Sequence, residues 1–248
     1  MTLTLDLSIF SKFNFKSPPV GVKFLLLKPE GLVKLDKKIP FCQMTAEAQQ
    51  SNTSFYADLE NQSCIPANYI LGYDIPKGIE SGYFGTGLKL FKEPRANRRI
   101  YQHITRMTKG IVNYFAFSPL DKLSFDPDLL MILTDDVSQA EIILRAMNYT
   151  AGQMWTSKMT NVLGCAWLFA YPYISGEVNY ITTGLSFGMI AHKVFPPNKQ
   201  LFSIPFNWLP TITQNLQDMP WELPSYTKNR EEVFRQITAE LGFDPFNL

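Results

Sequence analysis

The sequence lacks an excess of charge of either sign and has very little histidine. Among 248 residues, 23 Lys and Arg stand against 22 Asp and Glu, which leaves a net charge of +1. This balance argues against a polycationic nucleic-acid-binding protein and against an acidic tail. His103 and His192 are the two histidines, so a histidine-rich metal site is excluded and imidazole general-base chemistry has two candidates.

Long apolar runs are also missing. The first 17 residues mix acidic, basic and polar side chains and contain no apolar stretch typical of a secretory signal. The most apolar stretch, residues 162–174, contains Pro172 and is shorter than the roughly 20 helical residues that span a bilayer. We interpret it as a buried strand, and we expect a cytoplasmic protein that binds no membrane.

Familiar catalytic signatures are absent as well. The sequence contains no GxGxxG, GxxxxGK[ST], HExxH, CxxC or GxSxG pattern. Its three cysteines are an odd number for a disulfide framework, which a cytosolic chain of this length does not need. The sequence therefore indicates no particular reaction and leaves open whether the protein is an enzyme.

Aromatic side chains are abundant. They make up 14% of the chain, with 19 Phe and 11 Tyr. Such a surplus belongs in a core, in an aromatic-lined ligand pocket or in a homodimer interface, and the sequence leaves these three destinations open.

The pattern of apolar residues and turn signals predicts an α/β or α+β fold with a mixed sheet and packed helices. Strands are expected at 20–27 and 128–133, and helices at 43–52 and 138–152, the latter with a capping box from Ser138 to Glu141. The glycine-dense segment 76–87 is predicted to be a loop.

The same pattern divides the chain into three parts. Residues 1–17 are expected to form an arm or short helix, 18–217 the main domain, and 218–248 a proline-rich segment with a helix. The order of proline, strand, helix and cysteine recurs in 18–117 and 118–217. This recurrence fits two related halves, or simply the usual alternation of α/β proteins.

Several local patterns together resemble one known family. They are PPVGVKFL at 18–25, Cys42 before an alanine-bearing helix, Cys64 before Leu71-Gly72, Asp126-Pro127-Asp128, Gly164-Cys165-Ala166 and Ile204-Pro205. In this order, over roughly residues 15–217, the chain resembles domain-of-unknown-function family 169. The resemblance implies a soluble protein of the bacterial and archaeal kind and carries no agreed activity. Among the matching positions, only the three cysteines are chemically distinctive.

Cys42, Cys64 and Cys165 are the candidate metal ligands. Thiolates bind soft metals, and three of them can hold a 4Fe–4S cluster with one iron open to another ligand. Cys42 and Cys64 lie at predicted helix starts, where the helix dipole favours a thiolate. Spacings of 22 and 101 residues match no ligand motif, so redox-active thiols and inert core cysteines are alternatives.

A basic stretch at 89–109 is the second candidate region. Lys89, Arg95 and Arg98 could orient an anionic group, and Glu93 is the single acid among these residues. A solvated helix face would look the same. Because the net charge is near zero, a small anionic or aromatic molecule fits better than a nucleic acid.

Two functions from different classes remain. The first is a protein that binds an iron–sulfur cluster or soft metal through the three cysteines, beside a small-molecule pocket closed by the 78–87 loop. The alternative is a non-catalytic module that binds a small aromatic or anionic ligand and uses its cysteines structurally.

Overall fold

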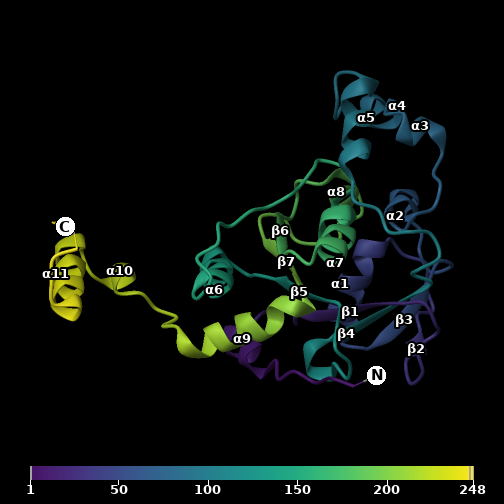
Figure 1. Cartoon of the computed structure of the whole chain (residues 1–248). Helices are drawn as coiled ribbons and strands as arrows, with labels where there is room; N and C mark the ends of the chain where they lie inside the picture. The colour runs from purple at the N-terminus through teal and green to yellow at the C-terminus, as the bar shows by residue number, and fades with distance from the viewer. Residues whose placement is uncertain (1, 246, 248) are drawn as a thin grey trace.

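A computed structural model describes residues 2–245 and 247 of the chain. Within them, one mixed sheet of seven strands forms the centre of the molecule, in the order β2-β3-β4-β1-β5-β7-β6 (Figure 1). The strands are β1 Val20–Leu25, β2 Val33–Lys34, β3 Phe55–Asp58, β4 Tyr114–Pro119, β5 Leu129–Leu133, β6 Asn179–Thr182 and β7 Gln200–Pro205. The fold is therefore of the predicted α/β or α+β class.

The central strand β1 pairs antiparallel with both β4 and β5. Its Val22 lies opposite Phe117 of β4 on one side and Leu129 of β5 on the other. β2 and β3 are the one parallel pair among the described strands. Each of the strands expected at 20–27 and 128–133 is thus present, in the middle of the sheet.

Hydrophobic cores lie on both faces of the sheet. All five residues of β5 are buried, and they alternate as a strand requires. Leu129, Met131 and Leu133 pack into a first core, whereas Leu130 and Ile132 pack into a second.

Helices cover both cores. Those that contribute to the first core include α1 Phe41–Ser51, α2 Ile65–Ile70, α5 Pro94–His103, the π-helix η3 Ala166–Ala170, α7 Tyr171–Ser175 and α8 Phe187–Ala191. Those of the second core are η1 Ser8–Phe13, α6 Val137–Asn148 and α9 Leu209–Asp218. The short helices η2 Leu120–Lys122 and η4 Phe206–Trp208 follow β4 and β7 directly.

Much of the aromatic surplus goes into the first core. Phe41, the first residue of α1, is fully buried, and its ring centroid lies 4.5 Å from that of Phe169 and 4.8 Å from that of Phe115. Aromatic pairs at these separations add packing energy beyond their buried area. These contacts join α1, η3 and the sheet directly beside Cys42, the second residue of α1.

Two segments stand away from the sheet (Figure 1). One carries α3 Lys77–Glu80 and α4 Tyr83–Gly87 and leads into α5. The other is the C-terminal segment with α10 Pro224–Thr227 and α11 Arg230–Leu241, and α11 has no buried residue.

Two predictions about local structure were wrong. Residues 162–174 form no strand but contain η3 and most of α7. A helix buried on all sides is apolar all round, so its sequence resembles that of a buried strand. The predicted loop at 76–87 contains α3 and α4. Its glycines allow close packing: Gly82 has φ 95° just before α4, and a Cβ on Gly85 would lie 2.2 Å from the side chain of Asn97.

Candidate functional site

Cys42, Cys64 and Cys165 line one pocket of about 160 Å³. Its walls come from α1, α2, the turn before η3, α8, and the α4–α5 segment that stands above the sheet. The lining residues are Cys42, Cys64, Pro66, Phe84, Gly85, Asn97, Tyr101, Val162, Leu163, Gly164, Cys165, Ser186, Phe187, Gly188, Met189 and His192. The fold thus brings together all three cysteines, which are separated by 22 and 101 residues in sequence.

Each cysteine stands where a helix begins. Cys42 is the second residue of α1, as predicted, and Cys64 caps the N-terminus of α2. Cys165 directly precedes η3. All three are free thiols, Cys42 and Cys165 buried and Cys64 half-buried.

The backbone around Cys64 is held by one side chain. The amide of Gln62, itself buried, accepts from the backbone N–H of Cys64 and donates to its carbonyl oxygen at 2.8 Å. The same Nε2 also donates to Asn68 Oδ1 at 2.6 Å. Both polar groups of the Cys64 backbone are therefore fixed by one residue, which positions the thiol against the pocket.

The turn before η3 places Cys165. Leu163 adopts a left-handed φ of 58°, and Ala166 N–H donates back to its carbonyl at 2.9 Å. Few non-glycine residues take this conformation. A second bond, from Phe187 N–H to Asn161 O at 2.8 Å, ties the start of α8 to the same turn, so Cys165 and Ser186 are held in adjoining walls.

Burial keeps the thiols protonated. It raises the pKa of Cys42 to about 12, with a smaller contribution from negative charge on Cys64. The pKa of Cys165 is raised well above its usual value, first by burial and then by charge on Cys64 and on Cys42. Burial also raises the pKa of Cys64. Charge on Cys64 thus acts on both other thiols, as expected for cysteines that line one pocket.

The thiols share the pocket without forming a ready coordination sphere. Over residues 2–245 and 247, no group of three or more His, Cys, Asp or Glu side chains is arranged to hold a metal ion. A metal centre would therefore need the three sulfur atoms to draw closer around it.

Two polar residues of the pocket were not expected from the sequence. Asn97 and Ser186 are buried, and Asn97 Oδ1 and Ser186 Oγ have no hydrogen-bond partner. Asn97 lies within the basic stretch, where its neighbours suggested only a charged helix face. Ser186 directly precedes α8 in the structure, a helix that the sequence pattern did not predict.

The predicted basic contacts lie elsewhere. Lys89, Arg95 and Arg98 are exposed and do not line the cysteine pocket. Arg98 lines a separate depression together with Lys77 and Glu80. A contact between these residues and an anionic group stays a prediction, and it would be made at the protein surface.

The two histidines also separate. His192 lines the cysteine pocket at the end of α8, whereas His103 is exposed at the end of α5. Tyr101 also lines the cysteine pocket, and burial raises its pKa to about 12. The Tyr101 hydroxyl therefore stays protonated at neutral pH, and His103 does not line the pocket.

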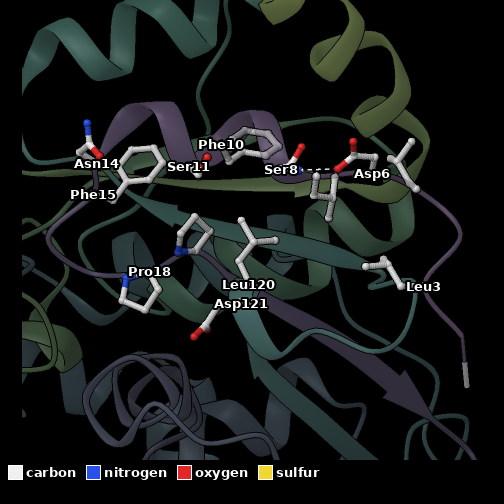
Figure 2. Close-up of a pocket in the computed structure, with 13 residues that line it drawn as sticks. Leu3, Asp6, Ser8, Phe10, Ser11, Asn14, Phe15, Pro18, Leu120 and Asp121 are labelled. Atoms are coloured by element: carbon white, nitrogen blue, oxygen red, sulfur yellow. Dashed lines mark hydrogen bonds between the residues drawn. The ribbon is translucent and has the colours of Figure 1, made fainter.

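A larger groove of about 480 Å³ runs along the N-terminal arm (Figure 2). Its walls are mainly apolar, with Leu3, Phe10 and Phe15 among them. The carboxylate of Asp6 already accepts from Ser8 N–H at 2.8 Å, which lowers its pKa. The groove contains no thiol or imidazole, so the chemistry of the molecule concentrates in the smaller pocket.

Comparison with known proteins adds a family but no activity. Residues 8–215 match the model of domain-of-unknown-function family 169, which carries the description "Uncharacterised ArCR". No curated protein and no solved structure matches the chain. No helix of the described residues has both the length and the apolar character needed to cross a membrane.

Proposed function

Because the chain belongs to domain-of-unknown-function family 169, which supplies no activity, we propose a function from its pocket: Cys42, Cys64 and Cys165 bind a soft-metal centre. A 4Fe–4S cluster is the form we propose first, and a single soft metal ion is the second. The proposal rests on one observation, which is that all the cysteines of the sequence line the same pocket.

The number and kind of donors suit such a centre. Cysteine thiolates are preferred by soft metals and by iron–sulfur clusters. Three thiolates leave one iron of a 4Fe–4S cluster without a protein sulfur, and that position would face a pocket with mostly apolar walls. The open position is where a small molecule would bind.

Protonation couples the centre to pH. The pKa of each thiol is raised in the metal-free protein, so binding must displace protons as the cationic centre stabilises the thiolates. Affinity is therefore expected to fall as the pH is lowered. Acidification should release the metal before the fold is lost.

Anaerobic purification from iron-replete cells tests the proposal. We expect a broad visible absorbance and about four iron and four sulfide per chain. Each of Cys42→Ala, Cys64→Ala and Cys165→Ala should remove most of the iron.

Met44→Ala is the matched control. Met44 is fully buried in α1, two residues from Cys42, but does not line the pocket. The variant should lose roughly 2–5 kcal/mol of stability and retain its iron. A colourless, metal-free wild-type protein, or full iron content in all three cysteine variants, would contradict the proposal.

A metal-free ligand pocket is the second candidate, and the unpartnered atoms of Asn97 and Ser186 favour it. In that case the cysteines serve as packing, and the protein is colourless but binds a small molecule in the same pocket. Metal content and ligand affinity measured on the same samples distinguish the two functions.

A further inference from the structure

Three buried polar side-chain atoms of the described residues have no hydrogen-bond partner: Thr45 Oγ1, Asn97 Oδ1 and Ser186 Oγ. Two of these residues, Asn97 and Ser186, line the cysteine pocket, and Thr45 does not. Leaving such a group unpaired is costly, and proteins rarely do so without a functional reason.

Asn97 presents a free acceptor. Its side-chain nitrogen donates to Gly82 O at 3.2 Å, and Oδ1 is left without a donor. A Cβ on Gly85 would lie 2.2 Å from Asn97 Nδ2. Gly85 is therefore needed for this close approach, and it is itself part of the pocket wall.

Ser186 repeats this arrangement at the start of α8. It is the residue before α8, yet its hydroxyl makes no capping hydrogen bond. A Cβ on Gly164 would lie 2.7 Å from Ser186 Oγ. Each unpartnered polar side chain thus packs against a glycine of the same pocket.

The remaining lining restricts what can bind. No Lys, Arg, Asp or Glu side chain lines the pocket, and its one histidine, His192, is exposed at the end of α8. A charged ligand inside the pocket would therefore lose its hydration without gaining a buried counter-charge. The cavity of about 160 Å³ is close to the size of one that holds benzene, about 150 Å³. The ligand is therefore compact, uncharged and largely apolar.

We propose that this pocket binds a small uncharged molecule of about ring size with one polar end, which donates a hydrogen bond to Asn97 Oδ1 and accepts one from Ser186 Oγ. Both atoms are shielded from water in the ligand-free protein, so the bonds form as the ligand enters and the side chains turn toward it. The inference rests on the second of the two proposed functions, the metal-free ligand pocket, because a ring-sized molecule would fill the cavity of about 160 Å³.

Three probes of similar shape test the two hydrogen bonds. Benzamide can donate and accept, acetophenone can only accept, and benzoate is charged. Isothermal titration of the full-length protein should show benzamide binding at least about fivefold more tightly than acetophenone, because acetophenone leaves Asn97 Oδ1 unpaired. Benzoate should bind more weakly than either.

Variants assign the effect to each residue. Asn97→Leu should abolish the preference for benzamide over acetophenone. Gly82 O remains satisfied in this variant, because Thr86 N–H and Thr86 Oγ1 also donate to it at 3.2 and 3.0 Å. Ser186→Ala should weaken both probes at least about threefold, since each uses its carbonyl to accept from the hydroxyl.

Thr45→Val is the matched control. It removes the third unpartnered atom, which lies outside the pocket, and should leave all three affinities unchanged. A Ser186→Ala protein that melts no lower than wild type, while binding more weakly, identifies a ligand contact and not a structural one.

Equal affinity for benzamide and acetophenone, or no benzamide binding at millimolar concentration, overturns the inference. So does an unchanged probe preference in Asn97→Leu, or unchanged affinities in Ser186→Ala if Asn97→Leu does not fold. Iron and sulfide are counted on the same samples, so loss of the metal proposal and loss of this one are seen separately.

Discussion

The three thiols of the pocket differ in how far they are shielded from water. Cys42 and Cys165 are each 7% exposed, whereas Cys64 is half-buried at the N-terminus of α2. Because the thiolate is the reactive form, a raised pKa slows alkylation at a given pH. The rate at which each thiol is alkylated therefore reports how deeply that cysteine is buried.

Iodoacetamide should therefore label the metal-free native protein in a fixed order. At pH 8 we expect Cys64 to react first and Cys42 and Cys165 more slowly, as measured by mass spectrometry of digested samples. Raising the pH toward the Cys42 pKa of about 12 should accelerate its labelling.

Unfolding in urea provides the control, because there the three cysteines lose their different surroundings and should react at similar rates. Similar rates in the native protein would contradict the burial described for Cys42 and Cys165.

The sequence identified the cysteines as the chemically distinctive residues, but it could not show that they line one pocket. The helix starts at Cys42 and Cys64 follow from local sequence, since proline and good helix formers surround them. That Cys165 joins them depends on packing of η3 against α2, which no local pattern encodes. The role of Asn97 could not be predicted because charged neighbours dominate its segment. Its close approach to Gly85 is also visible only in the fold.

At the scale of elements, the cap of α6 lies two residues before the predicted one. The helix was expected to be capped by Ser138 with Glu141 in a capping box. Asp136 is the cap instead, and its side chain accepts from Gln139 N–H at 3.0 Å. Glu141 pairs with Arg145 at 2.9 Å, one turn further along. A serine and an aspartate two residues apart are equally good caps, so sequence alone could not choose between them.

Replacing the two candidate caps separates the alternatives. Asp136→Ala should lower the free energy of unfolding by about 1 kcal/mol, because it leaves a helix N–H without its acceptor. Ser138→Ala should change it by less than about 0.5 kcal/mol. Urea denaturation monitored by circular dichroism measures both, and a larger loss for Ser138→Ala would restore the predicted capping box.

The misread elements share a physical cause. Strands β1 and β5 were predictable because a short apolar run bounded by proline is typical of a buried strand. Residues 162–174 offered the same apolar signal but form helices surrounded by the first core. Periodicity cannot separate a fully buried helix from a buried strand, and only the tertiary environment decides.

At the scale of the whole molecule, the two ends of the chain contribute unequally. The N-terminal arm buries Leu7, Ile9, Phe10 and Phe13 in the second core. The C-terminal helix α11 buries none of its residues and lies away from the sheet (Figure 1). The family match also ends at residue 215, before α10 and α11. A homodimer formed through surface aromatic residues stays a prediction.

Truncation should reveal this asymmetry. Removing residues 229–248 should leave the melting temperature within about 2 °C of the full chain. Removing residues 1–17 should cost more than about 3 kcal/mol, because the buried side chains of the arm are lost. Calorimetry of both proteins measures the difference, and a large loss on removing α11 would contradict it.

The strand order also determines when the chain can begin to fold as it is synthesised. β1 lies between β4 and β5, and 88 residues of chain lie between the end of β1 at Leu25 and the start of β4 at Tyr114. At roughly 5–20 residues per second, β1 waits on the order of ten seconds for its first partner. β2 and β3 cannot shield it, because β4 separates them from β1. A ribosome that pauses before residue 119 therefore carries a chain whose central strand has both edges open, and such edges can pair with strands of other chains.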